Sequence, residues 1–172
     1  RRPRSAEAEA ARAAYSSADS ALSSLERQLG ELETKLGEDY GPDHRFEFLS
    51  RSCFELKPDK EFSYEVCPFK EAKQRSGSNS YGTTIGKWKG FRAGGHDVME
   101  FDRGDYCHSA GARELAVHLE CGAENKLLSV SEPEVCKYSM RFTTPAACTA
   151  ADVESASADL ELLSPRSQRD EL

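Results

Sequence analysis

Near its start the chain carries an apolar pattern with the period of an α-helix. Over residues 5–37 the apolar positions recur at alternating spacings of three and four: Ala8, Ala11, Tyr15, Ala18, Leu22, Leu25, Leu29, Leu32 and Leu36. This alternation places them in one stripe along a helix, as in the core positions of a coiled coil. Gly37 is a suitable helix end. The pattern predicts a long helix that is either a solvated spacer or a coiled-coil stalk that binds a partner.

After a break rich in turn residues at Tyr40–Asp43, the period of the pattern changes to two. Apolar and polar residues then alternate in short runs, as in half-buried β-strands, with Gly- and Ser-rich turns between them. The clearest runs are Phe46–Phe48, Phe62–Cys67, Leu115–Cys121 and Lys137–Phe142. Regularly spaced short strands favour an all-β fold, a sandwich or flattened barrel, preceded by the long helix.

These changes divide the chain into three parts. We expect a helical, coiled-coil-like segment over 1–39, a β-domain over 40–149, and a flexible acidic tail over 150–172 with room for a short helix at 151–163. The net charge of −7 argues against binding to nucleic-acid phosphates. No apolar run has the length of a membrane span. Residues 1–15 lack the apolar run of a signal peptide, which favours a fragment of a longer protein.

The cysteines predict an oxidising compartment. All six lie between Cys53 and Cys148, and none belongs to a CxxC pair of the kind that zinc sites use. Three disulfides are therefore expected in place of a metal site, and the sequence leaves their pairing open. The last residues, Arg169–Leu172, resemble the KDEL-type signal that returns proteins to the endoplasmic reticulum. Both features predict a protein of the endoplasmic-reticulum lumen.

Two polar residues fall on the apolar side of predicted strands. Arg113 has the parity of Leu115 and Val117, and Tyr138 has the parity of Met140. A strand-end arginine that reaches solvent and an ordinary core tyrosine would explain them without a function. A polar pocket for a neutral sugar would explain them as well. Adjacent sugar hydroxyls each donate and accept, so they call for Arg donors, carboxylate acceptors, Gln and Tyr.

Several short sequences then match one known family. They are Tyr40-Gly41-Pro42, Cys53–Leu56, Cys67–Lys70, Gln74 within Lys73–Arg75, Gly86–Trp88, His96-Asp97, Cys121-Gly122, Glu132-Pro133, Cys136–Tyr138 and Thr144–Cys148. Through them the middle of the chain resembles the mannose 6-phosphate receptor homology (MRH) domain, in the form found in β-subunits of endoplasmic-reticulum glucosidase II. The resemblance implies a flattened β-barrel with three disulfides. It also implies a lectin with no catalytic residue, metal or cofactor.

The resemblance assigns individual residues. Four residues that contact mannose in the family correspond here to Gln74, Arg113, Glu132 and Tyr138. The disulfides it implies are Cys53–Cys67, Cys107–Cys136 and Cys121–Cys148. His108 stands where the mammalian-type subunit has a tryptophan near the sugar, which makes His108 a candidate secondary contact. Loss of that stacking surface would weaken binding or change the preferred mannose branch.

The function implied is that of a regulatory lectin module of glucosidase II. It would bind terminal mannose of high-mannose N-glycans and promote glucose trimming by the catalytic α-subunit, its expected partner. The alternative is a lectin of endoplasmic-reticulum-associated degradation that recognises trimmed mannose glycans. Those lectins carry a pair of tryptophans, and this chain has only Trp88.

A glycosidase would need two facing carboxylates, and no pair stands out among 30 acidic residues. The third class of function is a scaffold protein that binds its partners through the helix, with a β-domain that is only structural.

Overall fold

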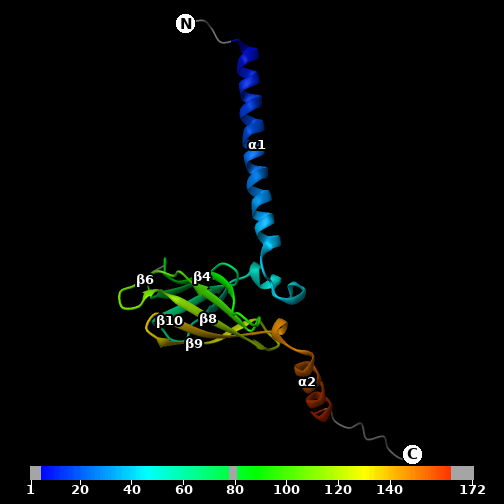
Figure 1. Ribbon diagram of the computed structural model, residues 1–172, viewed down its shortest axis with the longest axis vertical. Coiled ribbons are helices and arrows are strands. Elements are labelled where there is room, and N and C mark those ends of the chain that lie inside the picture. Colours follow the sequence, from blue (N-terminus) through cyan, green and yellow to red (C-terminus); the bar gives the residue numbers. More distant parts are fainter. Residues whose placement is uncertain (1–4, 78–80, 164–172) are drawn as a thin grey trace, which may run out of the picture. The chain divides into compact units, whose positions relative to one another are not determined.

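The computed structural model describes residues 5–77 and 81–163, in two compact units that divide between Asp39 and Tyr40. The first unit contains helix α1 (Ala6–Gly37), the long helix that the apolar spacing predicts (Figure 1). Ser5 caps α1, because its side chain accepts a hydrogen bond from the Ala8 amide at 3.2 Å. No residue of α1 is buried.

The second unit is a β-domain with short helices near its two ends. Its strands are β1 (Phe54–Leu56), β2 (Phe62–Cys67), β3 (Glu71–Ser76), β4 (Thr83–Phe91), β5 (Val98–Asp102), β6 (Tyr106–Cys107), β7 (Gly111–Ala112), β8 (Glu114–Cys121), β9 (Lys126–Glu134) and β10 (Lys137–Thr144). Its helices are the 3-10 helices η1 (Pro42–His44), η2 (Glu47–Arg51) and η3 (Pro145–Ala147), and the α-helix α2 (Ala150–Leu163).

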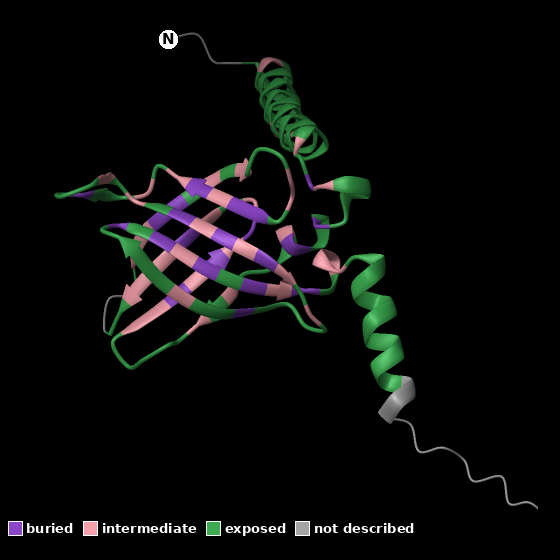
Figure 2. Ribbon diagram, turned by 60° about the horizontal axis from the view of Figure 1, so that its bottom comes forward, coloured by how far each residue is buried: buried purple, intermediate pink, exposed green. Residues whose placement is uncertain are grey.

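Eight strands form one sheet in the order β1-β2-β3-β4-β5-β8-β10-β9, and β6 and β7 form a separate hairpin. Within the sheet, neighbours run antiparallel except β8 and β10, which run parallel. The edge strands β1 and β9 approach each other. Near this seam the rings of Phe54 and Phe142 pack with their centroids 4.8 Å apart. The sheet is thus curled into a nearly closed barrel, which confirms the predicted fold class (Figure 2).

The barrel interior is built by alternate residues of the strands. Buried and less buried residues alternate along the strands in Figure 2. Of the residues that alternation placed on one face of β8 and β10, six are buried, whereas Cys121 at the end of β8 is exposed; the six are Leu115, Val117, Leu119, Tyr138, Met140 and Phe142. Ile85 of β4 and Phe101 of β5 belong to the same core. The period of two therefore identified the buried face of both strands correctly.

The run Phe46–Phe48 is not a strand, and that prediction is wrong. Residues Glu47–Arg51 form η2, and the Leu49 amide donates to the Phe46 carbonyl at 3.0 Å. Phe46 and Leu49 are buried, whereas Phe48 is 42% exposed. Apolar residues three apart fit one side of a 3-10 turn. Two alternating phenylalanines are too short a pattern to tell this turn from a strand.

Three disulfides cross-link the β-domain, and the described residues include no free cysteine. They join Cys53 to Cys67, Cys107 to Cys136, and Cys121 to Cys148, the pairing that the family resemblance implies. The bridge of Cys107 fastens the β6–β7 hairpin to the turn between β9 and β10. By closing loops in the unfolded chain, such bridges stabilise a domain of modest core size.

Helix α2 follows η3 and occupies the first part of the 150–172 segment. Thr149 and Asp152 cap it reciprocally: the Asp152 carboxylate accepts from the Thr149 amide at 2.8 Å, and the Thr149 hydroxyl accepts from the Asp152 amide at 3.3 Å. The retrieval-type residues 169–172 lie outside the described residues. Of the helices in the described part of the chain, none is long and apolar enough to cross a membrane.

Candidate functional site

The four side chains predicted to contact mannose come from separate segments of the β-domain. Gln74 lies on β3, Glu132 on β9, Tyr138 on β10, and Arg113 between β7 and β8. Because β8 runs parallel to β10 with Leu115 beside Tyr138, the residue before β8 lies near the start of β10. Arg113 Nη1 donates a hydrogen bond to Tyr138 Oη at 3.1 Å. The parallel pair thus brings together the two residues that strand alternation singled out.

A buried tyrosine that the sequence analysis did not select, Tyr64, joins Gln74 to this pair. Tyr64 lies opposite Gln74 in the β2–β3 pairing, and its Oη accepts a hydrogen bond from Gln74 Nε2 at 3.0 Å. The centroids of the Tyr64 and Tyr138 rings lie 6.4 Å apart. Tyr64 shares the inward parity of Val66, so the need of a buried hydroxyl for a partner was the signal that could have selected it.

Glu132 reaches the same cluster through the turn between β9 and β10. Its Oε1 accepts a hydrogen bond from the Cys136 amide at 2.5 Å, while Arg113 Nη1 lies 2.8 Å from the Cys136 sulfur. Cys136 has a left-handed backbone, with φ of 62°, and the β9–β10 register shifts between Lys137 and Ser139. This irregular turn brings the carboxylate and the guanidinium to one residue.

The buried Nε donor of Arg113 is left without an acceptor. Among the side-chain atoms of the described residues, Arg113 Nε stands out as buried with no hydrogen-bond partner. A buried N–H without an acceptor is costly, so such a group is expected where a ligand supplies one. The backbone of Arg113 is fixed by Gly104, whose amide donates to the Arg113 carbonyl at 3.0 Å. A Cβ on Gly104 would lie 2.9 Å from the Cβ of Arg113.

The electrostatics of the cluster keep its phenols neutral. Burial raises the pKa of Tyr138; the charge of Arg113 lowers this pKa, and that of Glu132 raises it. Burial likewise raises the pKa of Tyr64. Two neutral hydroxyls, a guanidinium, a carboxylate and an amide together offer both donors and acceptors, which is the mixture that adjacent hydroxyls of a pyranose require.

His108 belongs to the β6–β7 hairpin and is not part of this hydrogen-bonded cluster. It follows Cys107 in the β6–β7 hairpin, where its ring packs edge-on against the exposed Tyr106 ring with centroids 5.7 Å apart. Among the described residues it makes no hydrogen bond or ion pair with Gln74, Arg113, Glu132 or Tyr138. Its role as a secondary contact therefore stays a prediction.

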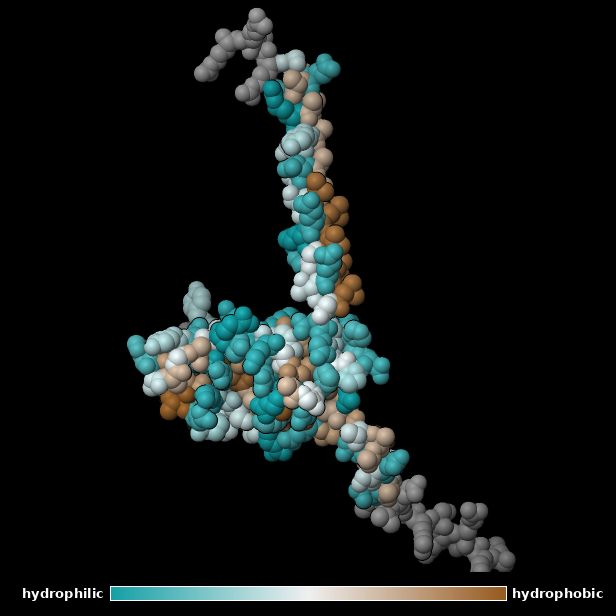
Figure 3. Space-filling view, viewed as in Figure 1, coloured by the Kyte–Doolittle hydropathy of each residue, from teal (hydrophilic) through white to brown (hydrophobic). Residues whose placement is uncertain are grey.

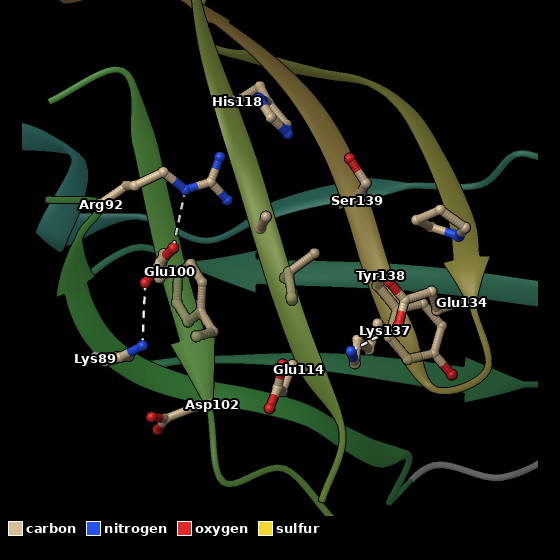
Figure 4. A pocket seen from close by; sticks show the side chains of 14 residues that line it. Lys89, Arg92, Glu100, Asp102, Glu114, His118, Glu134, Lys137, Tyr138 and Ser139 are labelled. Atoms are coloured by element: carbon tan, nitrogen blue, oxygen red, sulfur yellow. Dashed lines mark hydrogen bonds and ion pairs between the residues drawn. The ribbon is translucent and has the colours of Figure 1, made fainter. Parts of the chain in front are cut away.

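A hollow lies on the outer face of the sheet (Figure 4). Its volume is about 370 Å³, and its lining includes the register neighbours Ala116 and Ser139 and also Tyr138 of the cluster. Lys89 and Arg92 both pair with Glu100 there, at 3.1 and 3.0 Å. Because much of its charge is already paired, we interpret this hollow as a solvated ion-pair surface. In residues 5–77 and 81–163, no group of three or more His, Cys, Asp or Glu could hold a metal ion.

The nearly closed barrel with three disulfides is the fold of the MRH domain. The crystal structure of the MRH domain of glucosidase II beta bound to mannose matches this chain with a TM-score of 0.50 and 23% identity, covering 60% of this chain and 99% of that one. Within this class, residues 12–172 match the family described as glucosidase II beta subunit-like protein. The chain belongs to that family.

Relatives in plants and animals agree with this assignment. Glucosidase 2 subunit beta of Oryza sativa subsp. indica is 36% identical over 166 residues, which cover 96% of this chain and 26% of that protein. The Homo sapiens subunit is 34% identical over 124 residues, covering 70% of this chain and 23% of that protein. N-acetylglucosamine-1-phosphotransferase subunit gamma of Homo sapiens is 36% identical over 113 residues. The chain thus spans about a quarter of the length of the beta subunits.

Proposed function

We propose that the β-domain is a lectin that binds terminal mannose of high-mannose N-glycans. The cluster of Arg113, Glu132, Tyr138 and Gln74 would hold the sugar through its hydroxyls. Membership of the glucosidase II beta subunit-like family supports this proposal, as does the mannose bound by the MRH domain with the same fold. The cluster would act by binding alone, as part of a non-catalytic subunit.

The observation that carries the proposal is the incomplete pairing of Arg113. Its Nη1 is already held by Tyr138 while its buried Nε has no acceptor. A sugar hydroxyl placed between Arg113 and the Glu132 carboxylate would accept from the guanidinium and donate to the carboxylate. A sugar with that hydroxyl in the other orientation would leave the buried Arg113 donor unpaired, which is how such a site rejects an epimer.

Isothermal titration with mannobiose tests the proposal. Arg113→Ala, Glu132→Ala and Tyr138→Phe should each weaken binding by tenfold or more, since hydrogen bonds to charged groups contribute about 1.5–3 kcal/mol. Matched controls are Arg141→Ala, Glu134→Ala and Tyr106→Phe, whose side chains are exposed and should leave affinity unchanged. Unchanged affinity in all three site variants, with the disulfides intact, would rule out this cluster as the sugar site.

We further propose that mannose binding serves a catalytic glucosidase II α-subunit in the endoplasmic-reticulum lumen. The three disulfides and the KDEL-like residues Arg169–Leu172 support that compartment. Holding a glycan near the partner raises its effective concentration without new chemistry. Arg113→Ala in the full-length subunit should therefore slow glucose removal from a high-mannose glycan and leave hydrolysis of a small chromogenic glucoside unchanged. Equal loss with both substrates would contradict this role.

A further inference from the structure

The leucine stripe of α1 is uncovered in the described part of the chain. Leu22, Leu25, Leu29, Leu32 and Leu36 are 55%, 62%, 57%, 56% and 81% exposed. Figure 3 shows them as a continuous brown stripe along one side of the helix. Isolated helices are marginally stable in water, and most helices in proteins are stabilised by packing of their apolar face. A stripe of this kind is therefore typical of a helix that pairs with another surface.

The geometry of the stripe fits one partner helix. Its spacing alternates strictly between three and four residues, which is the 3.5-residue period of a left-handed coiled coil. The stripe has no third apolar row, which a helix packed into a globular core would need. A second helix laid along it would bury all five leucines.

Three carboxylates flank this stripe on one side. Asp19, Glu26 and Glu33 each directly follow an apolar seam residue and repeat every seven residues, so they lie where coiled coils form salt bridges between helices. Among the described residues, none of the three makes a hydrogen bond or ion pair, unlike Glu31, which Arg27 holds at 2.8 Å. The reason is local, because the residues four positions further on are serine or glycine: Ser23, Gly30 and Gly37.

The same flank disfavours pairing of α1 with a second copy of itself. In a parallel pair, the flanking position five residues before each carboxylate would face it, and those residues are Ala14, Ala21 and Gln28. In an antiparallel pair with the leucines in register, Glu26 would face Glu26 of the other copy, and Asp19 would face Glu33. In the first arrangement none of the three carboxylates meets a cation, and the one attractive pair is Glu7 with Arg12; the second arrangement brings like charges together.

We propose that α1 is the docking surface for one amphipathic helix of another polypeptide segment, with its own leucine-type seam and with Lys or Arg at seven-residue spacing along the facing flank. The leucines supply the buried area, while the three unpaired carboxylates select a basic partner and set its register. This surface lies in the first unit, so the inference is independent of the sugar site.

Two synthetic peptides test this proposal on the whole chain. Both carry the same leucine heptad seam, and their flanking positions are lysine in one and glutamate in the other. The lysine peptide should bind with at least roughly tenfold higher affinity by fluorescence anisotropy, and added salt should reduce the difference. Glu26→Lys with Glu33→Lys should reverse the preference. The matched control, Glu9→Lys with Glu31→Lys, makes the same change of net charge away from the flank. This control should still prefer the lysine peptide.

Three results would contradict the proposal that α1 binds a basic helix. Equal binding of the two peptides, or binding of neither while circular dichroism shows α1 helical, would overturn the proposal. Sedimentation equilibrium of the chain alone should report a monomer. A dimer that Leu25→Ser with Leu29→Ser abolishes would show that a second copy is the occupant, and would also overturn it.

Discussion

Among single residues, Arg113 connects the most parts of the candidate site. Its guanidinium contacts the Tyr138 hydroxyl and the Cys136 sulfur, and its carbonyl accepts from the Gly104 amide. Its side chain and its backbone are therefore both held in place, and its buried Nε has no acceptor within the protein. A fixed side chain loses little freedom on binding, so most of the energy of a hydrogen bond to sugar is retained.

Gly104→Ala should weaken mannose binding although Gly104 is not one of the predicted mannose contacts. The added Cβ would lie 2.7 Å from the Thr84 carbonyl oxygen and 2.9 Å from the Cβ of Arg113, so the backbone must shift. We expect roughly tenfold weaker binding and a loss of about 1–3 kcal/mol in the free energy of unfolding. Titration calorimetry and urea denaturation measure the two effects. Gly30→Ala, with open space around its Cβ, is the control, and equal sugar affinity in the two variants would contradict the prediction.

The buried tyrosines should make the folded state sensitive to alkali. Burial raises the pKa of Tyr64 and Tyr138 above the usual value of 10.0, so the folded protein holds these protons more tightly than the unfolded chain does. Their contribution to stability is complete below pH 10 and is lost as pH rises through the folded pKa values. The free energy of unfolding, measured in urea, should therefore fall above about pH 10. Tyr138→Phe should make the free energy of unfolding fall less steeply with pH, whereas Tyr106→Phe, at an exposed position, should not.

At the scale of elements, the parallel pairing of β8 with β10 and the turn between β9 and β10 assemble the site. The pairing brings Arg113 beside Tyr138, and the turn brings Glu132 to the Cys136 amide. The disulfide from Cys136 to Cys107 fastens this turn to the β6–β7 hairpin. The site thus depends on the Cys107–Cys136 disulfide more than on the other two disulfides.

Removing the bridges one at a time should separate stability from binding. Cys53→Ser with Cys67→Ser, and Cys107→Ser with Cys136→Ser, should each cost roughly 3–4 kcal/mol in the chain-entropy account. Only Cys107→Ser with Cys136→Ser should also reduce the mannose affinity of the folded fraction, because Cys136 contacts both Arg113 and Glu132. Urea denaturation and calorimetry measure the two properties. Equal sugar affinity in both double variants would contradict this division.

The sequence predicted the elements whose pattern is long and regular. The nine seam positions gave α1, and alternation gave the inward residues of β8 and β10. It failed at Phe46–Phe48, where two residues are too few to define a period. For the site, alternation selected Arg113 and Tyr138, while Gln74 and Glu132 rested on the resemblance. Gly104 could not be found from the sequence, because its role depends on backbone contacts made across the barrel.

At the scale of the molecule, the division into two units separates two proposed surfaces. The β-domain carries the cluster around Arg113, and α1 carries the leucine stripe with its acidic flank. The β-domain has its own buried core, built only from residues that follow Tyr40, so its folding does not require α1. In the two proposals, the β-domain surface holds a glycan and the α1 surface binds a basic amphipathic helix.

A chain that starts at Tyr40 should therefore fold and keep its sugar site. Without residues 1–39 we expect the same three disulfides, the same thermal midpoint within error, and the same mannose affinity, since Tyr40 begins the second unit. Peptide mapping, thermal denaturation and calorimetry test these points. Aggregation, or loss of mannose affinity on removal of α1, would show that the units depend on each other.

A crystal structure of the chain with α-mannose tests the central claim most directly. We expect one mannose with a hydroxyl between the Arg113 guanidinium and the Glu132 carboxylate, and with Tyr138 and Gln74 in contact with neighbouring hydroxyls. Sugar found only in the outer hollow beside Ala116 and Ser139, or no bound sugar in crystals that leave the Arg113 cluster open, would contradict it.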